Sequence, residues 1–213
     1  MKEVDSTERR SPGRKGLLLL LLVAGVAGGI LLAIELLRPD SATATIAELT
    51  REALERDGEV LRIRDDGTIF SGYLVSHYPD GTLRSRSRVV DGRLHGLSEG
   101  WYADGTPEIR EEFRAGLSHG VRLRWHPNGE MASRAEIEDG QLHGVFRRWR
   151  EDGTLWQVIH MRHSQPHGIS KAYFPSGYLE ARTEIERGNV VRQEFWDDGV
   201  MSDEGKNPNS ASL

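Results

Sequence analysis

Residues 96–119 have the sequence GLSEGWYADGTPEIREEFRAGLSH, one copy of a unit that recurs every 24 residues. The first full copy begins at Gly72, and the later copies begin at Gly96, Gly120, Gly144 and Gly168. A second glycine keeps the same period, at Gly81, Gly105, Gly129, Gly153 and Gly177. An aromatic residue keeps it too, at Trp101, Trp125, Trp149 and Tyr173, with His77 in its place in the first copy. Self-similarity at a fixed period indicates one supersecondary unit repeated end to end.

The second glycine predicts a β-hairpin in every unit. In three copies a proline lies two residues before it, as in Pro127-Asn128-Gly129. Because proline fixes φ for the first position of a type I turn and glycine supplies the left-handed residue that follows, we expect a three-residue loop with a bulge. Such a loop places three aromatic–aliphatic pairs opposite each other: Trp125 with Met131, Trp149 with Leu155, and Tyr173 with Leu179.

The expected strands alternate between apolar and charged residues. On the face of the repeated aromatics the alternation predicts Leu97, Val121, Val145 and Ile169 before the turn and Leu83, Met131, Leu155 and Leu179 after it. Farther along the second strand it adds Val89, Phe113, Ile137, Met161 and Ile185. The opposite face is expected to be charged, with Arg84, Arg86 and Arg88 in one copy and Glu108, Arg110, Glu112 and Arg114 in the next. This period of two is typical of a half-buried antiparallel sheet.

The predicted fold class is therefore an all-β repeat array. We expect a single-layer antiparallel sheet of stacked β-hairpins over residues 59–200, followed by a disordered tail over residues 202–213. The chain has 213 residues, a net charge of -5 and no cysteine. The negative net charge gives no electrostatic reason to expect binding to nucleic acid. The absence of cysteine excludes a disulfide framework, a thiolate metal site and a cysteine nucleophile.

The N-terminal segment predicts a membrane anchor. Leu17 to Ile34 is a run of 18 residues without a charge, and a helix of that length covers about 27 Å of the ~30 Å hydrocarbon core. Basic residues precede it, at Arg9, Arg10, Arg14 and Lys15, which favours a cytoplasmic N-terminus. We expect a cytoplasmic basic tail over residues 1–15, a transmembrane helix over 16–37, and an extracytoplasmic repeat domain in a single-pass protein of the cell membrane.

Two further expectations concern this segment. The alternative to an anchor is a cleaved signal peptide, for which Ala42-Thr43-Ala44 resembles a cleavage site; however, the apolar run exceeds the usual 7–15 residues and the site lies well beyond its end. Gly25 and Gly29 form a G-x-x-x-G motif, which lets two helix backbones approach closely and predicts a homodimer through these glycines.

Residues 45–57 are expected to form a short juxtamembrane α-helix. Thr45 and Glu48 fit a capping box, and Gly58 fits a helix stop. Two roles are open for this helix: a solvated spacer above the bilayer, or a cap over the first strand of the array, since the ends of repeat arrays need covering.

The repeats resemble MORN repeats, and more closely the variant MORN form of bacterial YwqK-type proteins, which are often described as antitoxins. The matching features are the W/Y-x-x-x-G core, from Trp101 to Gly105 and in its later copies, and the His-Gly closures such as His95-Gly96. The resemblance implies a hairpin array that acts as a scaffold, and the antitoxin description implies binding to a toxin protein. Some MORN proteins are proposed to bind lipids. An extracytoplasmic repeat domain departs from a role against a cytoplasmic toxin.

No catalytic, cofactor or metal site is predicted. The recurring histidines His95, His119, His143 and His167 are expected two strands apart, about 9.6 Å, which is too far to share one zinc ion. His160, His163 and His167 are closer in sequence and are the one alternative metal cluster. No nucleophile elbow, phosphate-binding loop or zinc-protease motif is present.

One polar patch is a candidate partner-binding site, made of Arg122, Arg124, Arg148, Arg150 and Trp156. Arginine beside an outward tryptophan is a composition typical of interface hot spots. The alternative is a solvated face neutralised by Glu136, Glu138, Glu184 and Glu186. The favoured function is a non-enzymatic, membrane-anchored scaffold that binds an unidentified protein at the cell envelope. The alternatives are binding of an envelope ligand (anionic lipid or cell-wall glycan) and neutralisation of a protein toxin.

Overall fold

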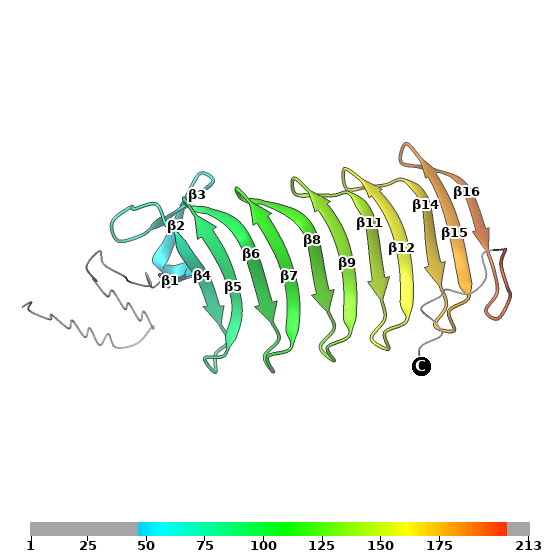
Figure 1. Ribbon diagram of the computed structural model, residues 1–213, viewed down its shortest axis with the longest axis horizontal. Helices are drawn as coiled ribbons and strands as arrows, with labels where there is room; N and C mark the ends of the chain where they lie inside the picture. The colour runs from blue at the N-terminus through cyan, green and yellow to red at the C-terminus, as the bar shows by residue number, and fades with distance from the viewer. Residues whose placement is uncertain (1–46, 204–213) are drawn as a thin grey trace, which may run out of the picture. The chain divides into compact units, whose positions relative to one another are not determined.

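The computed structural model describes residues 47–203, and this part is almost entirely β-structure. Its elements are β1 (Glu48–Thr50), the 3-10 turn η1 (Arg51–Ala53), β2 (Leu54–Asp57), β3 (Val60–Ile63), β4 (Gly72–His77), β5 (Leu83–Val90), β6 (Arg93–Trp101), β7 (Pro107–Arg114), β8 (Leu117–Trp125), β9 (Met131–Glu138), β10 (Gln141–Leu142), β11 (Gly144–Trp149), β12 (Leu155–Arg162), β13 (Gln165–Pro166), β14 (Gly168–Tyr173), β15 (Leu179–Glu186) and β16 (Asn189–Phe195). From β4 to β16 the strands follow one another across one long sheet (Figure 1). All of its neighbours pair antiparallel except β1, which lies parallel to β4.

Several predicted segments lie outside the described residues. They are the basic tail over residues 1–15, the transmembrane helix over 16–37 with Gly25 and Gly29, and all but the first two residues of the tail over 202–213. Between residues 47 and 203 no helix has the length and apolar character needed to cross a membrane.

The predicted hairpin loop is confirmed. Trp125 lies opposite Met131, Trp149 opposite Leu155, and Tyr173 opposite Leu179. In the loop between β8 and β9 the His126 N–H donates to the Glu130 carbonyl at 2.8 Å, which leaves three residues in the turn. The third of these is Gly129, whose φ of +87° is a left-handed conformation that side chains other than glycine rarely adopt.

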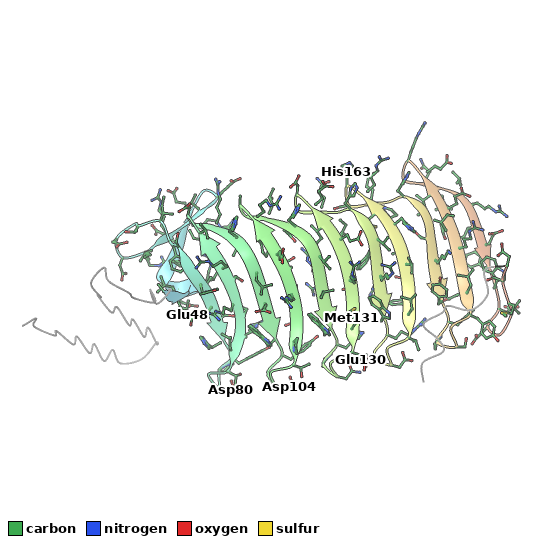
Figure 2. The ribbon with its side chains drawn as sticks, viewed as in Figure 1. Glu48, Asp80, Asp104, Glu130, Met131 and His163 are labelled. Carbon is green, nitrogen blue, oxygen red and sulfur yellow. The ribbon has the colours of Figure 1, made fainter. Side chains whose placement is uncertain are left out.

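An acidic side chain organises three of these loops. Asp80, Asp104 and Asp152 each accept a backbone N–H bond, at 2.9 Å, from the threonine two residues later. Asp80 and Asp104 lie along the loop edge of the sheet (Figure 2). The Thr82 and Thr106 bonds hold the pKa of Asp80 and Asp104 below its ordinary value, and the Thr154 bonds do the same for the pKa of Asp152.

These carboxylates predict a loss of stability in acid. Because each pKa is lower in the folded chain than in the unfolded chain, the contribution to stability is complete above about pH 5 and is lost as the pH falls through the folded value. We expect the urea midpoint to fall between pH 5 and pH 3. The fall should be smaller in the D80N/D104N/D152N variant, since asparagine keeps the acceptor without titrating, as Asn128 does for Glu130 in the native chain. An identical fall in both proteins would contradict this role.

The second strand of each hairpin carries one extra residue, which changes the face on which the later side chains lie. Trp149 pairs with Leu155 and Arg148 pairs with Gln157, so Trp156 is a bulge. The equivalent extra residues in the other hairpins are Arg84, Glu108, Ala132 and Glu180. Because side chains alternate along a strand, one extra residue moves every later side chain to the other face.

The two faces are therefore mixed, and the prediction of one apolar and one charged face is wrong beyond the bulge. Val89, Phe113, Ile137, Met161 and Ile185 lie opposite Gly72, Gly96, Gly120, Gly144 and Gly168, on the face away from the repeated aromatics. Arg86, Arg88, Arg110, Glu112 and Arg114 lie on the aromatic side instead. Arg86, for example, stacks on the Tyr73 ring at 3.8 Å. We call the face of Trp101, Trp125, Trp149 and Tyr173 the tryptophan face.

Successive hairpins are joined by turns of a different type. The turn between β5 and β6 has φ of +49° at Asp91 and +73° at Gly92, the two left-handed residues of a type I′ turn. The same pair of left-handed residues occurs at Ala115-Gly116, Asp139-Gly140, His163-Ser164 and Arg187-Gly188. The Gly92 N–H donates to the Phe70 carbonyl at 2.8 Å, and the N–H groups of Gly116 and Gly140 donate to the Leu94 and Ser118 carbonyls in the same way, one and two repeats later. The edge that carries His163, opposite the three-residue loops, is therefore held by backbone bonds between repeats (Figure 2).

At the loop edge, side chains link neighbouring hairpins. In each copy, the side chain that follows the repeated aromatic position is hydrogen-bonded to the backbone carbonyl of the repeated aromatic residue in the next copy. The pairs are Tyr78 Oη with Trp101, Tyr102 Oη with Trp125, His126 Nε2 with Trp149, and Arg150 Nη2 with Tyr173, at 2.8, 2.8, 3.0 and 2.5 Å. Burial raises the pKa of the Tyr102 hydroxyl, so this donor stays protonated. Phe174 takes this position in the next copy and has no polar atom to donate. We call this series the loop-edge ladder.

The predicted helix over residues 45–57 is wrong in the described part, residues 47–57. These residues form β1, η1 and β2. Leu49 pairs with Leu74 on β4, and Leu54 pairs with Ile63 on β3. Pairing with the open edge of β4 outweighs the local helix signals, as tertiary contacts commonly do, and Gly58 serves the β2–β3 turn at φ +58°.

The second predicted role of this segment, as a cap, agrees with the packing. Leu49, Leu54, Leu61, Phe70 and Val89 form the hydrophobic core. Four of these residues come from the segment before β4, and Val89 comes from the first hairpin. They make up half of the ten buried apolar residues in the described part of the chain. Beyond this cap, the described residues provide no second layer over the sheet, so most array side chains are only half-buried.

Candidate functional site

The five predicted partner-binding residues lie on one face of the sheet, opposite the tryptophan face. Arg124 pairs with Ser133 on β9, and Ser133 pairs in turn with Arg148 on β11. Arg122 and Arg150 follow at alternate positions of β8 and just beyond β11, so they project to the same side. We call this side the arginine face.

Trp156 reaches the arginine face because it is the bulge residue of β12. Its ring lies 4.4 Å from the Arg148 guanidinium carbon and 5.8 Å from that of Arg150. Both distances are within the range of cation–π attraction. Arg148 Nη1 also donates to Gln157 Oε1 at 3.5 Å. Packing against the indole limits the freedom of both guanidinium groups before any partner arrives.

These side chains surround a shallow, open hollow of about 490 Å³ over β8, β9, β11 and β12. It is lined by Arg124, His126, Ala132, Ser133, Phe146, Arg148, Trp149, Arg150, Glu151 and Trp156. We call it the arginine–tryptophan hollow. Its depth comes from two small residues, Ala132 and Ser133, which stand beside the large rings of Phe146 and Trp156. Ala132 occupies the bulge position where the next repeat has Trp156.

Arg122 does not join the hollow. Its guanidinium is bound to the Glu111 carboxylate of β7, and Ser118 Oγ donates to the same carboxylate at 2.9 Å. Arg122 is therefore neutralised within the sheet. Sequence reasoning missed this pair because Glu111 is on the neighbouring hairpin, 11 residues away.

The other three arginines keep their charge available. Arg124, Arg148 and Arg150 make no ion pair with any residue between 47 and 203. The carboxylates expected to neutralise the patch are on the wrong side, because Glu136 pairs with Val121 and Glu184 with Ile169 on the tryptophan face. Glu138 and Glu186 are two residues farther along the same strands, so they lie on the tryptophan face too. Glu151 is the one carboxylate that lines the hollow.

Two lining residues also belong to the loop-edge ladder. His126 and Arg150 bond the carbonyls of Trp149 and Tyr173. These bonds fix the two side chains at the rim and tie the hollow to the repeat spacing. The sequence signal for them was present, since Tyr78, Tyr102, His126 and Arg150 follow the repeated aromatics at the same period. It was missed because the residue type changes between copies.

The recurring histidines do not meet around a common point. His143 and His163 contact edge to face, with ring centres 5.6 Å apart, and His160 Nδ1 lies 2.7 Å from the Ile169 carbonyl. In the described part of the chain no three His, Cys, Asp or Glu side chains are grouped to hold a metal ion. What the site offers chemically is a cationic, aromatic surface.

The chain matches no known protein family, and a search of curated proteins gives no significant match. What the hollow recognises is therefore inferred from its own residues.

Proposed function

We propose that this protein is a non-enzymatic repeat scaffold that binds an acidic partner protein in the arginine–tryptophan hollow. The observation that carries the proposal is the combination of Arg124, Arg148 and Arg150, which form no ion pair with a residue between 47 and 203, beside the half-buried indole of Trp156. Arginine and tryptophan dominate binding energy at interfaces when they lie in a hollow at its centre. A carboxylate of the partner would meet guanidinium groups whose orientation the stacking already limits, which lowers the entropy lost on binding.

The proposal includes two expectations that rest on sequence alone. One is kinship with variant MORN-repeat proteins of the YwqK type, supported by the W/Y-x-x-x-G and His-Gly periods. The other is a membrane anchor over residues 16–37, which would present the hollow at the cell envelope. A tether of this kind favours a partner in the same membrane or close to it, because confinement raises the effective concentration of the two proteins.

The test is a matched pair of charge reversals in the full-length protein. R148E/R150E reverses two charges in the hollow, whereas R134E/R147E reverses two charges that face each other on the tryptophan face. Both variants change the net charge by the same amount. Copurified proteins are identified from cells that express the wild type, and the affinity of the purified partner is then measured for each variant.

We expect R148E/R150E to weaken binding roughly 30-fold or more, as the loss of one hot-spot residue already does. R134E/R147E should bind within about threefold of wild type. Equal losses in both variants would show a general charge effect and would contradict the site. Binding to vesicles with anionic lipid that depends on Arg148 and Arg150, without a protein partner, would favour the envelope-ligand alternative instead.

A further inference from the structure

The last strand of the sheet, β16, is an open edge. It pairs with β15 on one side, and no other strand between residues 47 and 203 pairs with it. Its apolar side chains Val190, Val191 and Phe195 are 59, 54 and 69 % exposed. The first strand of the array is covered by the cap. Residues 204–213, EGKNPNSASL, follow β16 and contain one large apolar residue and a proline. This composition is poorly suited to pairing with an exposed strand edge.

The sequence of this edge is complementary to itself about Gln193. Residues 190–196 are VVRQEFW. When two copies are placed antiparallel with Gln193 opposite Gln193, Arg192 of each copy faces Glu194 of the other. Val191 then faces Phe195. The pairing ends there, because Val191 is the extra residue of a bulge in β16, and this bulge places Val190 on the face away from Trp196. All contacts occur twice, as the two-fold symmetry of a homodimer requires.

The backbone points the right way for this pairing. The Trp196 N–H donates to the Glu180 carbonyl at 3.1 Å, toward β15. Inward and outward peptide groups alternate along an antiparallel strand, so the N–H and C=O of Gln193 point away from β15. Two Gln193 residues would exchange both hydrogen bonds. The flanking Arg192–Glu194 pairs would then occupy the closer positions, with Cα atoms about 4.5 Å apart.

Charge selects this register over its neighbours. A pairing centred one residue earlier puts Arg192 opposite Arg192, and one centred a residue later puts Glu194 opposite Glu194, both of which are destabilising. Within one chain Arg192 Nη2 lies 2.5 Å from Glu194 Oε1, so both side chains are on the same face, and Glu194 Oε2 also lies 3.7 Å from Arg182 Nη1 of β15. In the dimer Arg192 would exchange its own Glu194 for the Glu194 of the other copy. We propose that two copies of this chain join β16 to β16 about Gln193, which extends the sheet across a homodimer.

The absence of cysteine from the chain makes the test direct. In the full-length Q193C variant the two Cα atoms would lie about 5.5 Å apart, within the 4.4–6.8 Å that a disulfide spans. The control is T183C, because Thr183 lies opposite Gln193 but one strand inward. Two such residues would be about 14 Å apart across the dimer, at ~4.8 Å per strand. Both variants also carry G25L and G29L, which removes contacts through the predicted G-x-x-x-G helix pair.

We expect mild oxidation to crosslink Q193C into a dimer at least about tenfold faster than T183C. Adding R192E to Q193C should slow crosslinking about tenfold, because two ion pairs become repulsive. Adding E194R as well should restore it, since the charges are then exchanged but complementary. Crosslinking of Q193C no faster than T183C, or an R192E effect that E194R does not reverse, would overturn the proposal. R192E alone should leave binding in the hollow unchanged, so failure here is distinct from failure of the proposed function.

Discussion

Replacing Leu54 by alanine is expected to lower the free energy of unfolding by about 2–5 kcal/mol. Leu54 is 1 % exposed in the core that joins the cap to the first hairpin. Few other apolar side chains in the array are buried, so this core holds a large share of the apolar burial. A typical domain is stable by only 5–15 kcal/mol, and the loss would therefore be a substantial part of the total.

The matched control is Leu117→Ala, because Leu117 is 52 % exposed on β8. We expect that variant to lose less than about 1 kcal/mol. Urea denaturation of the full-length proteins, followed by far-UV circular dichroism and by tryptophan fluorescence, gives both values. Equal losses for the two leucines would mean that the cap does not stabilise the array.

Replacing Gly92 by alanine is expected to lower the free energy of unfolding by about 2–5 kcal/mol. Gly92 has φ +73°, where an added Cβ costs about 1–2 kcal/mol. That Cβ would also lie 2.1 Å from Val60 Cγ1 and 2.9 Å from the Leu61 carbonyl oxygen, and overpacking adds about 1–3 kcal/mol. The change would also disturb the turn whose backbone bonds connect the cap to β5 and β6.

Gly105 provides the control for backbone strain alone. Its φ is +85°, and an added Cβ would meet no atom within 4 Å. We expect Gly105→Ala to cost about 1–2 kcal/mol, measured by the same denaturation curves. If the two variants lose the same amount, the contact between Gly92 and Val60 is not tight in solution.

The hairpins were predictable because turn chemistry and period occur together in the sequence. Proline and glycine at fixed offsets determine the three-residue loop, and this loop determines that Trp125 faces Met131. The type I′ turns were predictable in part: Asp91-Gly92 and Asp139-Gly140 are strong signals for them. His163-Ser164 adopts the same geometry without a glycine and is carried by its place in the array.

The bulge at Trp156 could not be inferred from alternation. A bulge reverses the faces of all later side chains in the strand. Because both faces of this sheet carry apolar and charged residues, this reversal leaves no visible break in the alternation of apolar and polar residues along the sequence. Its consequence was large, since it moved Met161 to the arginine face, and the equivalent bulge at Ala132 keeps Glu136 on the other face. The strand conformation of the cap was unpredictable for another reason. Thr45, Glu48 and Gly58 fit local helix signals, and only the open edge of β4 makes pairing of β1 more favourable.

The grouping of Arg124, Arg148 and Arg150 was predictable because the bulges leave the first strand of each hairpin in register. The pairing of Arg122 with Glu111 was not, because it depends on which side chains meet between neighbouring hairpins. Charge composition alone therefore overestimated the size of the site.

The most direct test of the proposed recognition is site-specific photocrosslinking in intact cells. A benzophenone amino acid replaces Ala132, inside the arginine–tryptophan hollow, or Val121, which is 37 % exposed on the tryptophan face of the neighbouring strand. We predict that irradiation attaches the partner at position 132 and not at position 121. Attachment at position 121 with none at position 132 would contradict the claim that this protein recognises its partner through the hollow.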